Sequence, residues 1–224
     1  MDSRPELRPD ALQSWSRWHA LVALAAAVAA AFSAESSLFG LAAASSLLTL
    51  VWVGRGQYTP SGAFGPANWL TLARLGGIVA LPWLPAVAMG PALLAFLALD
   101  GLDGFVARKT GASSVFGAHF DMETDAVFVA ATSLELFTRG VLGAWVLLAG
   151  GLRYAYVLCL WCWRARRGDA PRSRWGRYAF FVLVLGLSAP WMLGTAVGAA
   201  AAAFGCAVVT LSFARSFYYS YSRG

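Results

Sequence analysis

Four aspartates in the middle of the chain have the spacing of a site for divalent cations. Asp100 and Asp103 are three residues apart, and Asp121 and Asp125 are four apart. Either spacing places both carboxylates on one face of a helix. Both pairs lie in or beside long apolar runs, where an ionised carboxylate is costly and usually marks a functional site. Four such charges need a counter-charge, and magnesium prefers oxygen ligands while keeping positions free for substrate phosphates.

Small residues share the predicted helix faces of these aspartates. They are Gly104 and Ala107 after the first pair and Gly117 before the second. Small side chains permit either close helix packing or the entry of a bulky ligand, and the sequence leaves both open. The alternative to a metal site is a set of ion pairs between the aspartates and nearby basic residues, namely Arg74, Arg108 and Lys109.

The composition is that of a helical membrane protein. Hydrophobic residues make up 59% of the 224 residues and charged residues 12%, and the mean hydropathy is +0.62. Eight apolar runs approach the length that crosses a bilayer; they cover about residues 19–33, 37–54, 67–88, 91–108, 115–138, 140–163, 178–194 and 196–214. Met-Gly-Pro at residues 89–91 predicts the turn between the third and fourth runs. The predicted fold class is therefore an all-α polytopic membrane protein.

Basic residues concentrate on one side of the predicted membrane. With a cytoplasmic N-terminus and eight spans, the cytoplasmic side receives the segments that carry most arginines, namely 1–18, 55–65, 108–114, 164–177 and 215–224. The other side receives only Glu35 and Arg139 as charged residues. This distribution follows the positive-inside rule and places the helix ends with the aspartates in the cytoplasm. The net charge of +6 is therefore no sign of nucleic-acid binding.

The spacing of the central motif is similar to a family signature. The pattern D-x-x-D-G-x-x-A-R-x8-G-x-x-x-D-x-x-x-D resembles that of the CDP-alcohol phosphotransferase family; it is matched here by Asp100, Asp103, Gly104, Ala107, Arg108, Gly117, Asp121 and Asp125. Residues 68–74, NWLTLAR, resemble the N-x-L-T-x-x-R that opens the first core helix of many members. Gly176-Arg177 is similar to the Gly-Lys of phosphatidylglycerophosphate synthases. The resemblance covers roughly residues 66–215.

The resemblance implies a metal-dependent transferase of substituted phosphate groups in phospholipid biosynthesis. CDP-diacylglycerol would donate a phosphatidyl group to a small polar alcohol and release CMP, with Asp125 as general base. Two ions, Mg²⁺ or Mn²⁺, would be held by Asp100, Asp103, Asp121 and Asp125. Residues expected to bind the CDP moiety are Asn68, Thr71, Asp103, Gly104, Ala107, Arg108 and Gly117. Residues expected to bind acceptor or phosphate are Arg74, Arg153 and Arg177.

The predicted domain organisation follows from the same family resemblance. Residues 1–65 are predicted to form a cytoplasmic tail and two additional transmembrane helices, ending in a Gly/Pro/Ser-rich loop at residues 55–65. Residues 66–224 are predicted to form a six-helix catalytic transmembrane domain. A cleaved signal peptide is the alternative for the first run, because Ala-Phe-Ser-Ala at residues 31–34 resembles a cleavage site. A homodimer in the inner membrane, with a cytoplasmic active site and no nucleic-acid partner, is expected.

Several charged residues have two interpretations. Arg74 and Arg153 lie in apolar runs, where a guanidinium can bind phosphate or pair with a carboxylate. His119 and Glu123 lie off the face of the aspartates, so a hydrogen-bonded histidine and an ion-paired glutamate are predicted there. Glu135 is predicted to pair with the arginine one turn later.

Two further questions stay open at this point. Cys159-x-x-Cys162 has the spacing of a redox or metal motif but lacks a second pair, so both cysteines are predicted to be packing residues of an apolar helix. Asp-Met-Glu-Thr-Asp at residues 121–125 is similar to the D-M-x-T-D of eukaryotic inositol enzymes, and the acceptor is left open. A carboxylate-lined ion transporter or channel is the alternative function.

Overall fold

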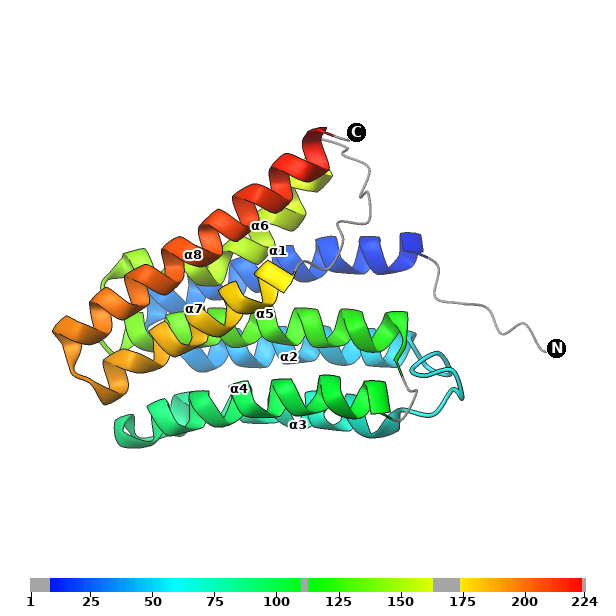
Figure 1. Ribbon diagram of the computed structural model, residues 1–224, viewed down its shortest axis with the longest axis horizontal. Helices are drawn as coiled ribbons and strands as arrows, with labels where there is room; N and C mark the ends of the chain where they lie inside the picture. The colour runs from blue at the N-terminus through cyan, green and yellow to red at the C-terminus, as the bar shows by residue number, and fades with distance from the viewer. Residues whose placement is uncertain (1–8, 110–112, 163–173, 223–224) are drawn as a thin grey trace.

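The computed structural model describes residues 9–109, 113–162 and 174–222, and these fold into α-helices joined by short connections. Successive α-helices run in opposite directions, so α1, α3, α5 and α7 begin toward the right-hand side of Figure 1. The α-helices within the described residues are α1 (Pro9–Ser33), α2 (Ser36–Val53), α3 (Gly65–Ala80), α4 (Ala86–Lys109), α5 (Val115–Thr138), α6 (Leu147–Cys162), α7 (Arg174–Met192) and α8 (Thr195–Ser222). Two short 3-10 helices, η1 (Leu81–Trp83) and η2 (Ala144–Val146), lie in the connections.

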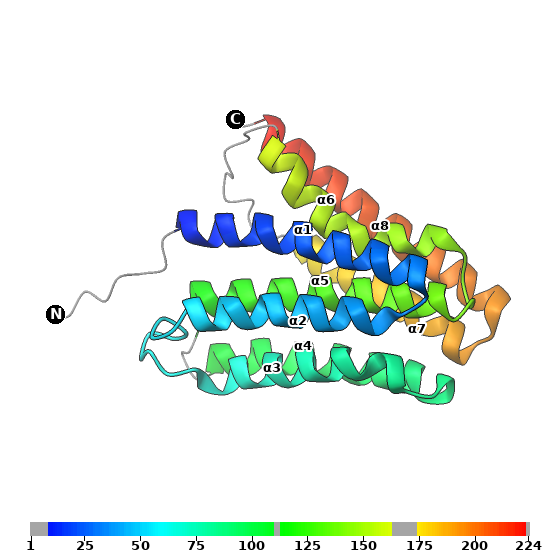
Figure 2. The same cartoon turned by 180° about the vertical axis from the view of Figure 1, so that it is seen from behind.

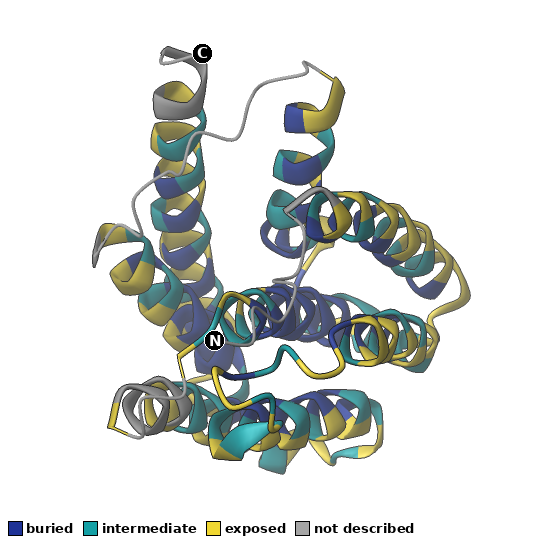
Figure 3. Ribbon diagram, turned by 90° about the vertical axis from the view of Figure 1, so that its right-hand side faces the viewer, coloured by how far each residue is buried: buried dark blue, intermediate teal, exposed yellow. Residues whose placement is uncertain are grey.

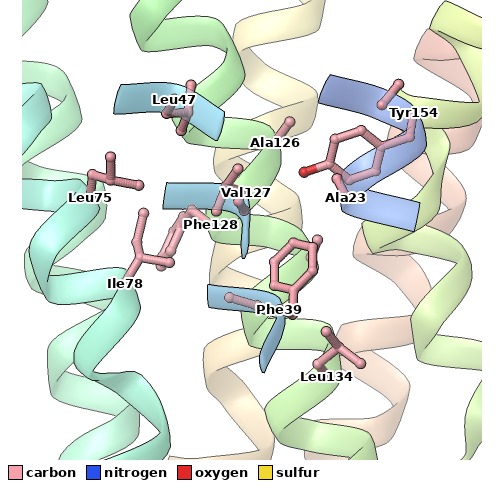
Figure 4. Close-up of a cluster of buried hydrophobic side chains, with 14 of the residues drawn as sticks. Ala23, Phe39, Leu47, Leu75, Ile78, Ala126, Val127, Phe128, Leu134 and Tyr154 are labelled. Atoms are coloured by element: carbon pink, nitrogen blue, oxygen red, sulfur yellow. The ribbon is translucent and has the colours of Figure 1, made fainter. Parts of the chain in front are cut away.

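Helix α5 forms the centre of the bundle. Every residue from Ala126 to Leu136 is buried, and Figure 3 shows buried residues concentrated in the middle of the molecule. Its neighbours are α1, α2, α3 and α6. Figure 4 shows side chains from these helices meeting around Val127 and Phe128 of α5. A helical segment that is buried on all sides in this way occupies the core of the bundle.

The N-terminal helices α1 and α2 pack against the rest of the bundle. Helix α2 contacts α5 and α3, and α1 contacts α6 and α5 as well as α2. Figure 2 shows α1, α2 and α3 side by side on one face of the molecule. The two added helices are therefore built into the bundle that holds the aspartates.

Four helices within the described residues are long and apolar enough to cross a bilayer. They are Ala11–Ser33, Ser36–Val53, Ala144–Cys162 and Thr195–Tyr218. Helix α3 has only 16 residues, and α5 contains Asp121, Glu123, Asp125 and Glu135, which lower its hydropathy. The all-α membrane fold is consistent with the sequence prediction, whereas crossing by all eight helices stays a prediction.

The predicted turn at Met89–Pro91 is wrong. The chain turns instead at Leu84, which has extended backbone angles of φ −77° and ψ 138°. A residue that precedes proline is disfavoured in the α conformation, and Pro85 follows here. Helix α4 begins directly afterwards and includes Pro91 near its start. Gly90 lies against Met192 at the end of α7, so close helix contact explains the glycine.

Three other boundaries also differ from the prediction. Helix α1 begins at Pro9 rather than near residue 19, with proline at the first helical position, where its fixed φ favours a helix. Helix α8 continues to Ser222, beyond residue 214, where the eighth apolar run ends. Helix α6 begins at Leu147 rather than near residue 140, because Gly140 has a left-handed φ of +67° and ends the preceding helix.

At the end of the bundle opposite the aspartates, Arg139 joins α5 to the α3–α4 connection. Its Nε donates to Glu135 Oε2 at 2.7 Å, which confirms the predicted pair. Its Nη1 donates to the Leu84 carbonyl at 2.9 Å. Its Nη2 donates to the Pro82 and Leu81 carbonyls at 2.9 and 3.2 Å. One side chain thereby binds three carbonyls at the break between α3 and α4, where regular helical hydrogen bonding stops.

We expect Arg139→Ala to destabilise the fold without affecting the site. The change leaves the buried Glu135 carboxylate without its cation and removes three carbonyl partners, at a cost of about 2 kcal/mol or more. The thermal unfolding midpoint of the purified protein measures the effect, with Trp145→Phe at the same end as a control. An unchanged midpoint would show that these contacts do not contribute to stability.

The orientation of the bundle is open to a direct test. A reporter fused after Glu35, between α1 and α2, should be read on the outer face, and one fused after Ser61 in the cytoplasm. The reason is the predicted concentration of arginines on the cytoplasmic side. A mature protein that begins near Glu35 would instead establish cleavage of the first apolar run, and reversed reporters would contradict the orientation.

Candidate active site

Helices α3, α4 and α5 meet at a cluster of three carboxylates around Arg74. Helix α3 packs against both α4 and α5, and Arg74 on α3 is only 1% exposed. Its Nη1 lies 3.1 Å from Asp100 Oδ1 on α4 and 3.1 Å from Asp121 Oδ1 on α5. Its Nη2 contacts Asp125 Oδ1, one turn further along α5. The ion pairs predicted as an alternative for Arg74 are therefore present.

The carboxylates of this cluster fit a divalent cation. Ligand oxygens of Asp100, Asp121 and Asp125 all lie within 4.8 Å of one another. All three residues are partly buried, so the oxygens remain accessible from one side. Three negative charges face one guanidinium, and hard oxygen ligands of this kind suit Mg²⁺ or Mn²⁺. Asp100 of the first half of the motif thus lies close to both aspartates of the second half, with Arg74 between them.

The start of α5 is fixed by a cap that also joins it to the α2–α3 loop. Ser114 Oγ accepts a hydrogen bond from the Gly117 amide at 2.9 Å and donates to the Tyr58 carbonyl at 2.5 Å. A side-chain oxygen at this position satisfies an amide that the first helical turn leaves unpaired. The connection sets where α5 begins and hence the height at which Asp121 lies.

Asn68 and Gly117, both predicted to bind the CDP moiety, lie next to each other. Asn68 Nδ2 donates to the Phe64 carbonyl at 2.6 Å and to the Tyr58 carbonyl at 3.3 Å. A Cβ on Gly117 would lie 3.0 Å from Asn68 Oδ1. Close packing of α3 against α5 therefore explains this glycine, and a role of either residue in nucleotide binding stays a prediction. Thr71 donates to the Ala67 carbonyl at 3.2 Å.

Four motif residues cannot be placed at the level of side chains. Helix α4 continues through them to Lys109, but the side chains of Asp103, Gly104, Ala107 and Arg108 lie outside the described part of the structure. Their roles therefore stay predictions from the motif. Arg177 is exposed in the first turn of α7, and its role also stays a prediction.

Arg153 lies against Glu123 on the other side of α5. Its Nη2 donates to Glu123 Oε1 at 2.6 Å, and its Nε lies 3.5 Å from Oε2. The predicted pairing of Glu123 with a basic residue is confirmed. Because Arg153 already has this partner, its predicted binding of phosphate would require it to contact two anions.

Sequence reasoning missed how closely the N-terminal helices approach this second cluster. Ser16 Oγ on α1 lies 2.9 Å from His119 Nε2 on α5, which confirms His119 as a hydrogen-bonded residue. His19, one turn further along α1, bonds Ser46 of α2 through Nδ1 at 2.9 Å. The sequence does contain a sign of this approach. The buried residues of α1 have the spacing of one face of an amphipathic helix; they are Leu12, Ser16, His19, Ala20 and Ala23.

The fold and the site define a helical membrane protein whose bundle holds a carboxylate cluster suited to a divalent cation. A family model, CDP-alcohol phosphatidyltransferase, matches residues 64–211. The chain therefore belongs to the CDP-alcohol phosphatidyltransferase family. No solved structure matches this chain significantly. The matched region includes the three helices of the carboxylate cluster, whereas α1 and α2 precede it.

Family membership gives the general reaction. Proteins of this family transfer a phosphatidyl-type group from a CDP-alcohol to an alcohol acceptor, generally with a divalent metal. The carboxylates of Asp100, Asp121 and Asp125 form a group that could hold such a metal in this chain. Four apolar helices and the family together indicate a multi-pass membrane protein.

Proposed function

We propose that this protein transfers the phosphatidyl group of CDP-diacylglycerol to the hydroxyl of a small polar alcohol and releases CMP. The observation that carries the proposal is the convergence of Asp100, Asp121 and Asp125 within 4.8 Å in a bundle of this family. A donor with two acyl chains fits a site on helices that lie in a bilayer. The predicted cytoplasmic orientation fits a nucleotide leaving group.

Asp125 is the proposed general base. The acceptor oxygen attacks the phosphorus of the phosphatidyl group, a new P–O bond forms, and the P–O bond to CMP breaks with its electron pair passing to CMP. The acceptor proton passes to a carboxylate oxygen of Asp125. The Asp125 side chain is 22% exposed, so an acceptor hydroxyl can reach it, and its contact with Arg74 fixes its orientation.

Asp100, Asp103, Asp121 and Asp125 are the proposed metal ligands. When bound, two Mg²⁺ or Mn²⁺ ions would neutralise the phosphate oxygens and the charge that develops on the departing CMP. The aspartates on α4 and α5 hold their oxygens in place because both helices pack against α3. Asn68 and Thr71 on α3, together with Gly117 at the start of α5, are proposed to contact the CDP moiety. Arg74 and Arg177 are proposed for phosphate or acceptor, and Arg74 would then contact an anion in addition to its three carboxylate partners.

The experiment that tests this function is the release of CMP from CDP-diacylglycerol by the purified protein. Inositol, inositol phosphate, glycerol phosphate and serine would each be offered as acceptor, with magnesium and with manganese. We expect one acceptor to support turnover and the lipid product to contain it. An ion transporter would release no CMP with any acceptor at any metal concentration. The homodimer and the inner-membrane location stay predictions, to be checked by size analysis and fractionation.

A further inference from the structure

Helix α5 carries a second polar cluster directly behind the catalytic aspartates. Glu123 lies two residues from both Asp121 and Asp125, which on a helix turns it about 160° away from each of them. His119 lies one turn before Glu123, on the same rear face. The two faces of this short segment thus have separate polar partners, Arg74 in front and Arg153 behind.

The rear cluster is buried and held by short contacts. Glu123 is 1% exposed and receives the 2.6 Å hydrogen bond from Arg153 Nη2. His119 Nε2 lies 3.8 Å from the same carboxylate. A buried ion pair has demanding geometry, because either charge without its partner is strongly destabilising. The pair therefore fixes both the rotation of α5 about its axis and its height relative to α6.

Helix α1 closes this cluster from outside the family region. Ser16 bonds His119, and the ring of Trp15 stacks on His19 with centroids 4.7 Å apart. The His19 ring in turn contacts the Tyr154 ring, next to Arg153, with centroids 5.9 Å apart. Figure 4 shows Tyr154 beside Ala23 of α1. The additional helices thus contact the residues that hold α5 in place.

We propose that the Glu123–Arg153 pair, together with His119 and the Ser16 hydroxyl that bonds it, positions the aspartates of α5. The N-terminal helices would then form part of the active-site support. The reaction in which this matters is the proposed phosphatidyl transfer. A helix transmits a rotation from one face to the other, so a change at Glu123 displaces Asp121 and Asp125 relative to Asp100 and Arg74. Displacement of metal ligands by about 1 Å is enough to reduce catalysis about 100-fold.

The test compares the single variant Glu123→Gln with the double variant Glu123→Gln/Arg153→Met. The single change weakens the Glu123–Arg153 ion pair. The double change also removes the Arg153 guanidinium, which would otherwise be buried without its carboxylate, so the bundle should remain folded. Both would be measured in the full chain by thermal unfolding, by Mn²⁺ binding in electron paramagnetic resonance, and by steady-state kinetics. We expect Mn²⁺ affinity and kcat to fall about 10- to 100-fold, as for other supports of metal ligands, with both KM values within about threefold.

The matched control is Glu135→Gln on the same helix. Glu135 is also 1% exposed and also pairs with an arginine, Arg139, but it lies about 15 Å further along α5 than Asp125. We expect this variant to lower the unfolding temperature while leaving Mn²⁺ affinity within about threefold of wild type. Ser16→Ala, which removes the hydrogen bond between α1 and His119 and leaves the Glu123–Arg153 pair in place, should lower Mn²⁺ affinity by a smaller factor, about threefold to tenfold.

Specific outcomes overturn the proposal. Wild-type Mn²⁺ affinity and kcat in the folded double variant would show that the rear cluster serves stability alone. A rise in the acceptor KM on loss of Arg153, with Mn²⁺ affinity unchanged, would make Arg153 an acceptor ligand instead. A wild-type chain that binds no Mn²⁺ would leave no metal ligands to position. Wild-type protein that binds Mn²⁺ but releases no CMP would contradict the proposed function alone, because the Mn²⁺ comparison does not depend on substrate.

Discussion

Asp125→Asn should lower CMP release by about 1,000-fold or more. A general base contributes about 10²- to 10⁴-fold, and the amide is also a poorer metal ligand than the carboxylate. Asparagine has the size of aspartate and can still accept a hydrogen bond from Arg74, so the bundle should fold and bind the CDP-lipid. Turnover would be measured as CMP released from CDP-diacylglycerol, and binding by equilibrium retention of the labelled lipid.

The adjacent residue provides the control for this substitution. Thr124 is fully buried, and its hydroxyl donates to the Phe120 carbonyl of its own helix at 2.8 Å. Thr124→Val removes that hydroxyl at nearly constant volume and should keep activity within about threefold of wild type. Comparable turnover in the Asp125→Asn protein and the wild type would remove Asp125 from the role of base.

Removing one carboxylate from each helix should have effects that do not add. Asp100 on α4 and Asp121 on α5 both place an oxygen 3.1 Å from the same Arg74 nitrogen, so they belong to one site. Asp100→Ala or Asp121→Ala alone should lower kcat/KM by about 100-fold or more. The double variant should lose little beyond the worse single variant, because ligands that act as a unit are lost together.

The measurement is CMP release titrated with magnesium and with manganese for the two single variants, the double variant and the wild type. Both single variants should require higher metal concentrations for half-maximal rate, and chelator should abolish wild-type activity. Strictly additive losses, or full activity in chelator, would mean that the two aspartate pairs do not form a common metal site. The mechanism proposed above would then have to be abandoned.

Sequence periodicity predicted the elements whose ends carry local signals. Helix α5 occupies the predicted residues 115–138, because Ser114 is a good N-cap and Gly140 stops the helix. The turn after α3 was misplaced because the stretch contains three prolines, Pro82, Pro85 and Pro91, and only tertiary packing shows that Pro91 remains helical while Leu84 turns. The polar residues at the start of α1 were expected outside the helix, since their burial depends on α5 and α6, which lie far along the chain.

The site was predictable to the extent that helical spacing sets it. The spacing of Asp121 and Asp125 was enough to place them on one face, whereas the packing of α4 and α5 against α3 brings Asp100 near them. The partners of the arginines could not be decided in this way. Arg74 and Arg153 both lie in apolar runs with carboxylates within reach, and the choice between front and rear of α5 depends on how three helices rotate against one another.

The two buried glutamates of α5 have consequences for how the ribosome delivers this protein to the membrane. Glu135 finds its cation four residues later on the growing chain, so the pair is complete when α5 leaves the exit tunnel. Glu123 must wait for Arg153, 30 residues later on the next helix. An unpaired carboxylate in hydrocarbon is costly, so α5 would be retained at the translocon until α6 arrives. With α5 crossing the bilayer, as the sequence predicts, the two helices would enter it together as a hairpin that packs against α1 and α2.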